Sequence, residues 1–206
     1  MGERPLARSV VARQRFGRLF SLGDRNSPSS WTPALILGND DEKLSYSMAP
    51  FEYSRDSSSL PAKISIKTRT NLTLPFNQLD TWVASEGLVL PPSLVESNSG
   101  EFGIGKEILP VSWQSLHHDL SLNNEELVPS IIILTDAPQL ANQKGLLSEA
   151  LYIIRTRFPS SLIWTPGIGG PDNCAILTWL GVDIFDLGRS RNASSLGVIL
   201  SENGPR

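Results

Sequence analysis

The spacing of hydrophobic and polar positions is most regular after residue 130. "SIIILTD" (130–136) is a continuous run of mostly β-branched residues that follows a proline, which is typical of a strand buried on both faces. "QLANQKGLLSEALYIIRTRF" (139–158) ends in arginines that suit the carboxyl end of a helix. Its apolar residues recur at helical spacing: Leu140, Leu147, Leu151 and Ile154. The pattern predicts a buried strand followed by one long amphipathic helix.

Two more strands and a short helix are predicted beyond it. "SLIWTPG" (161–167) and "VDIFDL" (182–187) have the apolar character of strands, and "PDNCAILTWLG" (171–181) has a proline at its start and a glycine at its end, as short helices do. Strands that alternate with helices imply parallel strands joined by right-handed crossovers. We therefore expect an α/β fold.

The first 130 residues are less regular. "RFGRLFSLGDRN" and "SWTPALILGND" each predict a strand, and "AKISIKTRTNLTL" (62–74) alternates with period two, as a half-exposed strand does. Between 75 and 130 the apolar pieces are short. The expected organisation is one domain over 1–206, with a β-ribbon over 1–30 and barrel units over 31–206.

Composition narrows the class of protein. The chain has 206 residues, of which 40% are hydrophobic, a net charge of −3 and one cysteine. These values suit one globular core, exclude a disulfide framework and give no overall attraction to nucleic acid. No apolar run is long enough for a membrane span, so we expect a cytoplasmic protein without membrane contact and without a cofactor.

The amino-terminal segment is rich in arginine. Arg13, Arg15 and Arg18 stand in a stretch that contains a single acid, Glu3. Three interpretations stay open: a solvated face, a contact to RNA phosphates, or a transit peptide.

Candidate chemistry lies where the predicted strands end, since ligands of parallel α/β folds bind at the carboxyl ends of strands. Asp136 follows one strand and Asp186 ends another. The turn between them contains Gly167, Gly169 and Gly170 before a predicted helix, a place suited to an anion or a polarised carbonyl. Alternation places Asp183 on the other side of its strand from Asp186, which favours a structural role for Asp183.

Each of these features has a simpler interpretation. A glycine-rich turn can serve geometry alone, and a carboxylate at a strand end often caps the next helix. Arg189 and Arg191, just past Asp186, could bind phosphate, pair with Asp186 or lie on a solvated loop. We predict no metal site.

Two regions of the chain resemble the tRNA-guanine transglycosylase superfamily, including its archaeal archaeosine branch. "ARQRFGRLFSLGDRNSPSSWTPALILGN" is similar to the family's opening β-ribbon and the Thr-Pro-Ala that begins its barrel. "PGIGGPDNCAILTWLGVDIFDLGRSRNASSLGVILSENG" is similar to its glycine turn and its Gly-[Ile/Val]-Asp-x-Phe-Asp block. Together they cover about a third of the chain. The resemblance implies a TIM-barrel-like (β/α)8 fold, shortened or incomplete, with an amino-terminal β-ribbon.

It also implies a function. Enzymes of the family exchange a guanine in tRNA for a 7-deazaguanine through a covalent intermediate, and Asp186 stands at the position of the nucleophile that attacks the ribose. Gly167, Gly169 and Gly170 would then bind substrate, while Arg13, Arg15, Arg18, Arg189 and Arg191 would contact tRNA.

The sequence departs from the family at several points. The Asp-Ser-Gly-Gly-Phe motif, which carries the second catalytic aspartate, has no counterpart between 60 and 130, and Asp136 is a weak replacement. A Cys-x-Cys-x-x-Cys zinc block is absent from these residues. Three hypotheses follow: a protein similar to archaeosine synthase, a transferase that acts on 7-deazaguanine already present in tRNA; a non-catalytic tRNA-binding or scaffold subunit whose partner carries zinc or RNA-binding domains; and an active transglycosylase.

Overall fold

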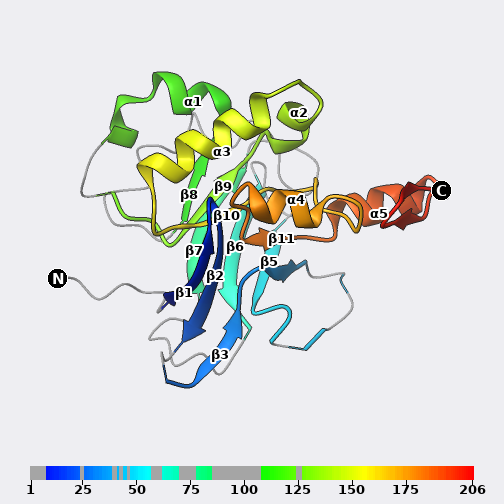
Figure 1. Cartoon of the computed structure of the whole chain (residues 1–206), viewed down its shortest axis with the longest axis horizontal. Helices are drawn as coiled ribbons and strands as arrows, with labels where there is room; N and C mark the ends of the chain where they lie inside the picture. Colours follow the sequence, from blue (N-terminus) through cyan, green and yellow to red (C-terminus); the bar gives the residue numbers. More distant parts are fainter. Residues whose placement is uncertain are drawn as a thin grey trace.

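A curled eight-stranded sheet organises the protein. The computed structural model describes residues 8–23, 26–38, 41, 44–45, 47–56, 62–69, 78–84, 108–123 and 127–206. The sheet lies between a layer of helices and a three-stranded antiparallel ribbon near the amino terminus (Figure 1). The strands in spatial order are β7 (Gln78–Ala84), β6 (Ala62–Thr68), β5 (Phe51–Asp56), β4 (Ala34–Leu37), β11 (Ile184–Phe185), β10 (Leu162–Trp164), β9 (Ile131–Leu134) and β8 (Ile108–Val111).

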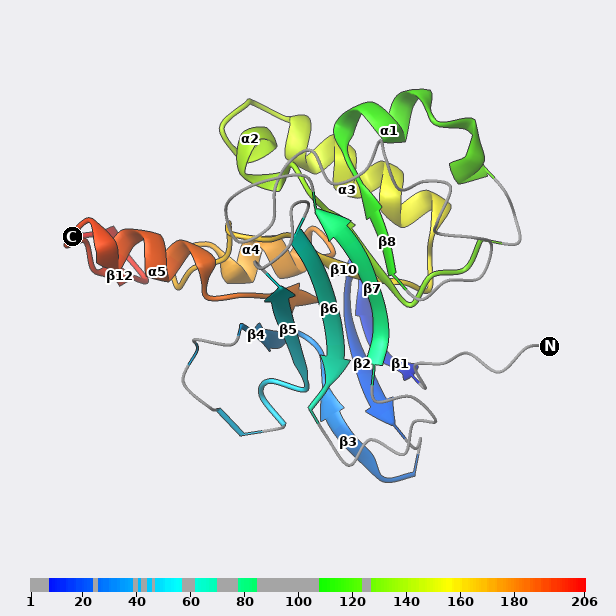
Figure 2. The same ribbon diagram turned by 180° about the vertical axis from the view of Figure 1, so that it is seen from behind.

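Six of these strands form a parallel half-barrel. Strands β8 to β11, β4 and β5 are parallel, whereas β6 and β7 extend the β5 edge in antiparallel pairing and bend away with the curl of the sheet (Figure 2). From β8 to β11, and from β4 to β5, each strand is added on the same side of the strand before it. Ile184 of β11 pairs with Ala34 of β4. A doubly wound sheet would reverse direction from its first strand. The predicted α/β class with parallel strands is confirmed, and the sheet is compatible with a partial barrel.

Both faces of the half-barrel are buried, which explains the unbroken apolar runs. Ile131, Ile133 and Trp164 pack inside the curl, together with Phe20 of the ribbon. Ile132 and its outward-facing neighbours pack against the helices. Alternate residues of one strand therefore enter different cores.

The helices are shorter than the sequence patterns suggest. They are α1 (Trp113–His118), α2 (Ala137–Ala141), α3 (Leu146–Arg157), α4 (Cys174–Trp179) and α5 (Gly188–Ser195), with a 3-10 turn η1 (Leu120–Asn123). The single helix predicted over 139–158 is wrong, because a turn ending at Gly145 separates α2 from α3. Gly145 has a φ of 84°, a left-handed conformation that interrupts the helix and that glycine adopts without strain.

The ribbon consists of β1 (Arg8–Gln14), β2 (Gly17–Gly23) and β3 (Pro28–Trp31). The strand predicted over "SWTPALILGND" is two strands, since β3 ends at Trp31 and β4 begins at Ala34. Arg8 donates to the carbonyl of Ser160 and Arg18 to that of Pro159, in the loop that precedes β10. The ribbon therefore lies against the amino ends of the parallel strands and leaves their carboxyl ends to other residues.

The strand predicted over 62–74 is described only as β6, which ends at Thr68. A small hairpin, β12 (Leu200–Ser201) and β13 (Gly204–Pro205), follows α5.

Candidate functional site

Polar and aromatic side chains meet at the carboxyl ends of the parallel strands. We call Asp41, Tyr53, Trp164, Asp186 and Arg191 the mouth network. They come from the segment after β4, from β5, from β10, from the residue after β11 and from α5. Register places them near one level, since Ile184 pairs with Ala34 and Ile36 pairs with Phe51.

Asp186 is the most engaged member of the network. Its Oδ2 accepts hydrogen bonds from Nε1 of Trp164 at 2.9 Å and from the backbone N–H of Gly167 at 3.0 Å. Its Oδ1 accepts from the N–H of Gly188 at 2.7 Å. The residue is only 4% exposed. The carboxylate thus joins β10, the glycine turn and the start of α5.

This environment limits the chemistry of Asp186. Burial raises the pKa of its carboxyl above the usual value, although the hydrogen bonds from Trp164, Gly188 and Gly167 act in the opposite direction. Both oxygens already accept hydrogen bonds from the chain. A carboxylate held in this way positions its neighbours well, but an attack on a sugar carbon would require at least one oxygen to leave its donors.

The glycine turn is explained largely by packing. Gly167 has a φ of 72°, and its N–H points at Asp186. A Cβ at Gly169 would lie 2.6 Å from Cδ1 of Phe185, and a Cβ at Gly170 would lie 2.5 Å from Nη1 of Arg189. The N–H of Gly170 donates to Oδ1 of Asn173 at 2.8 Å. Two of the N–H groups that could have bound an anion are therefore used by the chain itself.

Arg191 links the two sides of the mouth. Its guanidinium donates to Oδ1 of Asp41 at 2.7 Å and to the hydroxyl of Tyr53 at 2.8 Å. The ring of Tyr53 lies 5.6 Å from that of Trp164. Burial raises the pKa of Tyr53, so its hydroxyl keeps its proton at neutral pH. No sequence motif marks Asp41, Tyr53 or Trp164, and only the pairing of β4 with β11 brings them together.

Arg189 makes a separate ion pair at the surface. Its guanidinium contacts both carboxylate oxygens of Asp172, at 2.5 and 2.8 Å, and both side chains are partly exposed. Neither Arg189 nor Arg191 pairs directly with Asp186 in the bonds described. Contact of these arginines with RNA stays a prediction.

Asp136 lies at the carboxyl end of β9, in a different setting. Its Oδ2 accepts from the N–H of Trp113 at 2.9 Å at the start of α1, while its buried Oδ1 has no hydrogen-bond partner. Burial raises the pKa of Asp136. Asp136 and Asp186 have no common hydrogen-bond donor in the described structure, so their joint action in catalysis stays a prediction.

Asp183 occupies the amino end of β11 and is fully enclosed. It pairs with Arg155 at 2.8 Å and accepts the N–H of Ile163 at 2.9 Å. The structure therefore places Asp183 and Asp186 at opposite ends of one short strand. Asp183 therefore has a structural role in the protein interior.

The amino-terminal arginines differ in exposure. Arg13 and Arg15 are exposed, and the guanidinium of Arg15 lies 5.4 Å from the centre of the Trp179 ring. Arg18 is buried, and burial, with a smaller effect of nearby Arg155, lowers its pKa to about 10. Contact of Arg18 with an RNA phosphate does not fit this burial.

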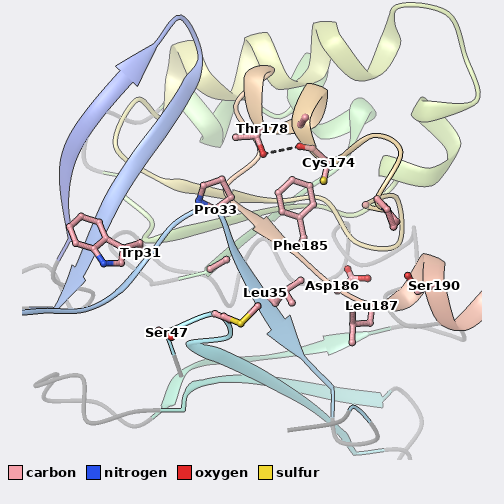
Figure 3. A pocket seen from close by; sticks show the side chains of 16 residues that line it. Trp31, Pro33, Leu35, Ser47, Cys174, Thr178, Phe185, Asp186, Leu187 and Ser190 are labelled. Carbon is pink, nitrogen blue, oxygen red and sulfur yellow. Dashed lines mark hydrogen bonds between the residues drawn. The ribbon is translucent and has the colours of Figure 1, made fainter. Parts of the chain in front are cut away.

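A hollow of about 790 Å³ opens beside the glycine turn. Gly169, Gly170 and Asp186 lie on its wall, and neither Gly167 nor Asp136 is among its lining residues. Most of the wall is apolar, with Trp31, Pro33 and Phe185 around the opening (Figure 3). Its size falls within the range of small-molecule sites.

No family model matches the chain, and no curated protein matches it significantly. Among the helices that the structure describes, none is long and apolar enough to cross a membrane. Within the same residues, no group of three or more histidine, cysteine or acidic side chains could hold a metal ion.

Proposed function

We propose that this chain is a cytoplasmic tRNA-binding protein of the tRNA-guanine transglycosylase and archaeosine synthase type, and that its half-barrel is part of a (β/α)8 barrel. It recognises tRNA that contains a 7-deazaguanine. Asp186 is a positioning residue in it, not a nucleophile. Any chemistry on the base is supplied by a partner subunit.

The observation that carries this proposal is the environment of Asp186. The residue follows β11 beside the glycine turn, at the position that the resemblance assigns to a nucleophile. Yet three N–H donors of its own chain hold the carboxylate, and it is buried. This favours recognition over base exchange, and therefore favours the non-catalytic hypothesis over the active transglycosylase.

The test compares binding with exchange in the same preparations. Filter binding measures the affinity for a tRNA transcript and for the same tRNA carrying 7-deazaguanine, and incorporation of labelled guanine measures exchange. We expect tighter binding of the modified tRNA, a strong decrease of affinity with salt, and no exchange.

Asp186→Asn and Asp172→Asn are the two variants. Asp172 is a suitable control because its carboxylate is partly exposed and outside the mouth network. If the wild type exchanges guanine and Asp186→Asn does not, while both retain the same circular dichroism, Asp186 is a nucleophile and the proposal is wrong. Equal affinities for both tRNAs, or none, would also contradict it.

A further inference from the structure

Two hollows share part of their lining. The hollow beside the glycine turn adjoins a second one of about 650 Å³. Both are lined by Pro33, Ala175 and Thr178, so α4 forms a wall common to the two. We call the combined surface of the two hollows the α4 groove. It runs from the glycine turn to the tip of the β1–β2 hairpin.

One end of the groove is apolar and aromatic. Trp31 is 40% exposed and Met48 is 58% exposed, and both line the hollow together with Phe185. Ser47 and Ser190 add hydroxyl groups to the same wall. Large apolar side chains that line a hollow and remain exposed indicate a surface that another molecule covers.

The other end is cationic. Arg13 lines the second hollow, is exposed and has no ion-pair partner among the described residues. Arg15 lies over the ring of Trp179, which is 42% exposed and lines the same hollow. Among the described residues that line the two hollows, the acidic one is Asp186, and its oxygens accept hydrogen bonds from Trp164 and from backbone N–H groups. The groove is therefore positively charged at the end formed by the second hollow.

Exposed aromatic rings next to arginines match the needs of a single nucleic-acid strand. Bases stack on aromatic side chains, and arginines contact the phosphates that follow. The wall that α4 contributes offers side chains to a ligand and not a sheet edge.

We propose that the α4 groove binds a single-stranded RNA segment, with a base in the apolar end and a phosphate at Arg13 and Arg15. This site shares Asp186 with the mouth network but otherwise has a different lining, and it rests on the proposed function only in taking RNA as the natural ligand. It would let the protein hold an unpaired part of a tRNA outside the barrel while the mouth remains accessible.

Adjacent residues of α4 provide a matched test. Ala175 lines both hollows, whereas Ile176 is 60% exposed and lines neither. Ala175→Glu places a carboxylate in the groove, and Ile176→Glu places the same charge beside it. Binding of a labelled single-stranded oligouridylate is measured by fluorescence anisotropy on the full chain, with an RNA duplex as the comparison ligand.

We expect Ala175→Glu to weaken oligouridylate binding about tenfold or more and Ile176→Glu to change it less than about twofold, because a groove charge repels phosphate directly. Arg13→Gln should weaken binding by about threefold to tenfold and lower the salt slope by about one ion. Cys174, the single cysteine, is exposed on the groove wall, so the oligouridylate should also slow its reaction with a maleimide.

The outcomes separate this inference from the proposed function. If the wild type binds modified tRNA but Ala175→Glu and Ile176→Glu bind oligouridylate equally, the groove is not the site and the proposed function stands. If the wild type binds oligouridylate through the groove but shows no preference for modified tRNA, the groove assignment stands and the proposed function fails. Absence of oligouridylate binding, or a change of oligomeric state in Ala175→Glu with unchanged RNA binding, overturns the inference.

Discussion

The buried ion pair between Arg155 and Asp183 should be the most sensitive point of the fold. Both side chains are nearly inaccessible, at 5% and 1% exposure. Arg155 also donates to the carbonyls of Ser161 and Gly181, and Asp183 accepts the N–H of Ile163. The pair therefore joins α3 to the starts of β10 and β11. The perturbation we consider is Asp183→Asn, which keeps the size of the side chain and removes its charge.

The expected loss follows from the burial. Removing one member of a buried pair leaves an uncompensated charge and costs about 3–5 kcal/mol. A domain of ordinary stability unfolds with about 5–15 kcal/mol, so the variant should lose from about a fifth to nearly all of its stability. With a urea dependence near 2 kcal/mol per molar, the midpoint should fall by about 1.5–2.5 M.

Urea unfolding followed by circular dichroism measures this loss. Asp172→Asn serves as the matched control, because its partner Arg189 is also an arginine but the pair is partly exposed. An exposed pair contributes only about 0–1 kcal/mol, so the control should unfold close to the wild type. If Asp183→Asn unfolds at the same urea concentration as Asp172→Asn, the buried pair does not stabilise the protein and the reasoning is refuted.

Three more predictions concern a strand end, the glycine turn and the turn before α3. Burial raises the pKa of Asp136, so its contribution to stability is lost as the pH rises through the folded pKa. Asp136→Asn should therefore gain stability relative to the wild type as the pH rises above about 4, the pKa of a free aspartate, and a constant difference in urea midpoints would contradict this. Gly169→Ala should lower the free energy of unfolding by about 1–3 kcal/mol, since the added Cβ would lie 2.6 Å from the ring of Phe185. Gly145→Ala, with open space but a φ of 84°, should cost about 1–2 kcal/mol, and equal melting temperatures of Gly169→Ala and the wild type would show that the turn has room.

The parallel part of the fold could be predicted because its signals are local. The run Ile131–Leu134 is buried on both faces, and a continuous apolar run predicts just that. The break before α3 was missed, because the leucines on either side keep helical spacing across the turn while the left-handed backbone at Gly145 interrupts it. Hydrophobic spacing alone does not distinguish one long helix from two short ones in line.

The position of the candidate site could be predicted from the sequence, but the hydrogen bonding of its carboxylate could not. The end of an apolar strand placed Asp186 beside the glycine turn, and the structure has it there. The hydrogen bonds that Asp186 accepts from Trp164 and Gly188 depend on where β10 and α5 lie in space, and no local sequence pattern encodes that. For Arg191 the sequence left a phosphate contact, a pair with Asp186 and a solvated loop open, yet Asp41, 150 positions earlier, binds it.

The pairing of β4 with β11 has a consequence for biosynthesis. Ala34 leaves the ribosome long before Ile184, its partner in the sheet, and at ~10 residues per second the delay is roughly fifteen seconds. Until then the nascent chain exposes one edge of β4, which is open to wrong partners. Chaperones that protect such an edge should therefore matter until the segment around Ile184 has been translated.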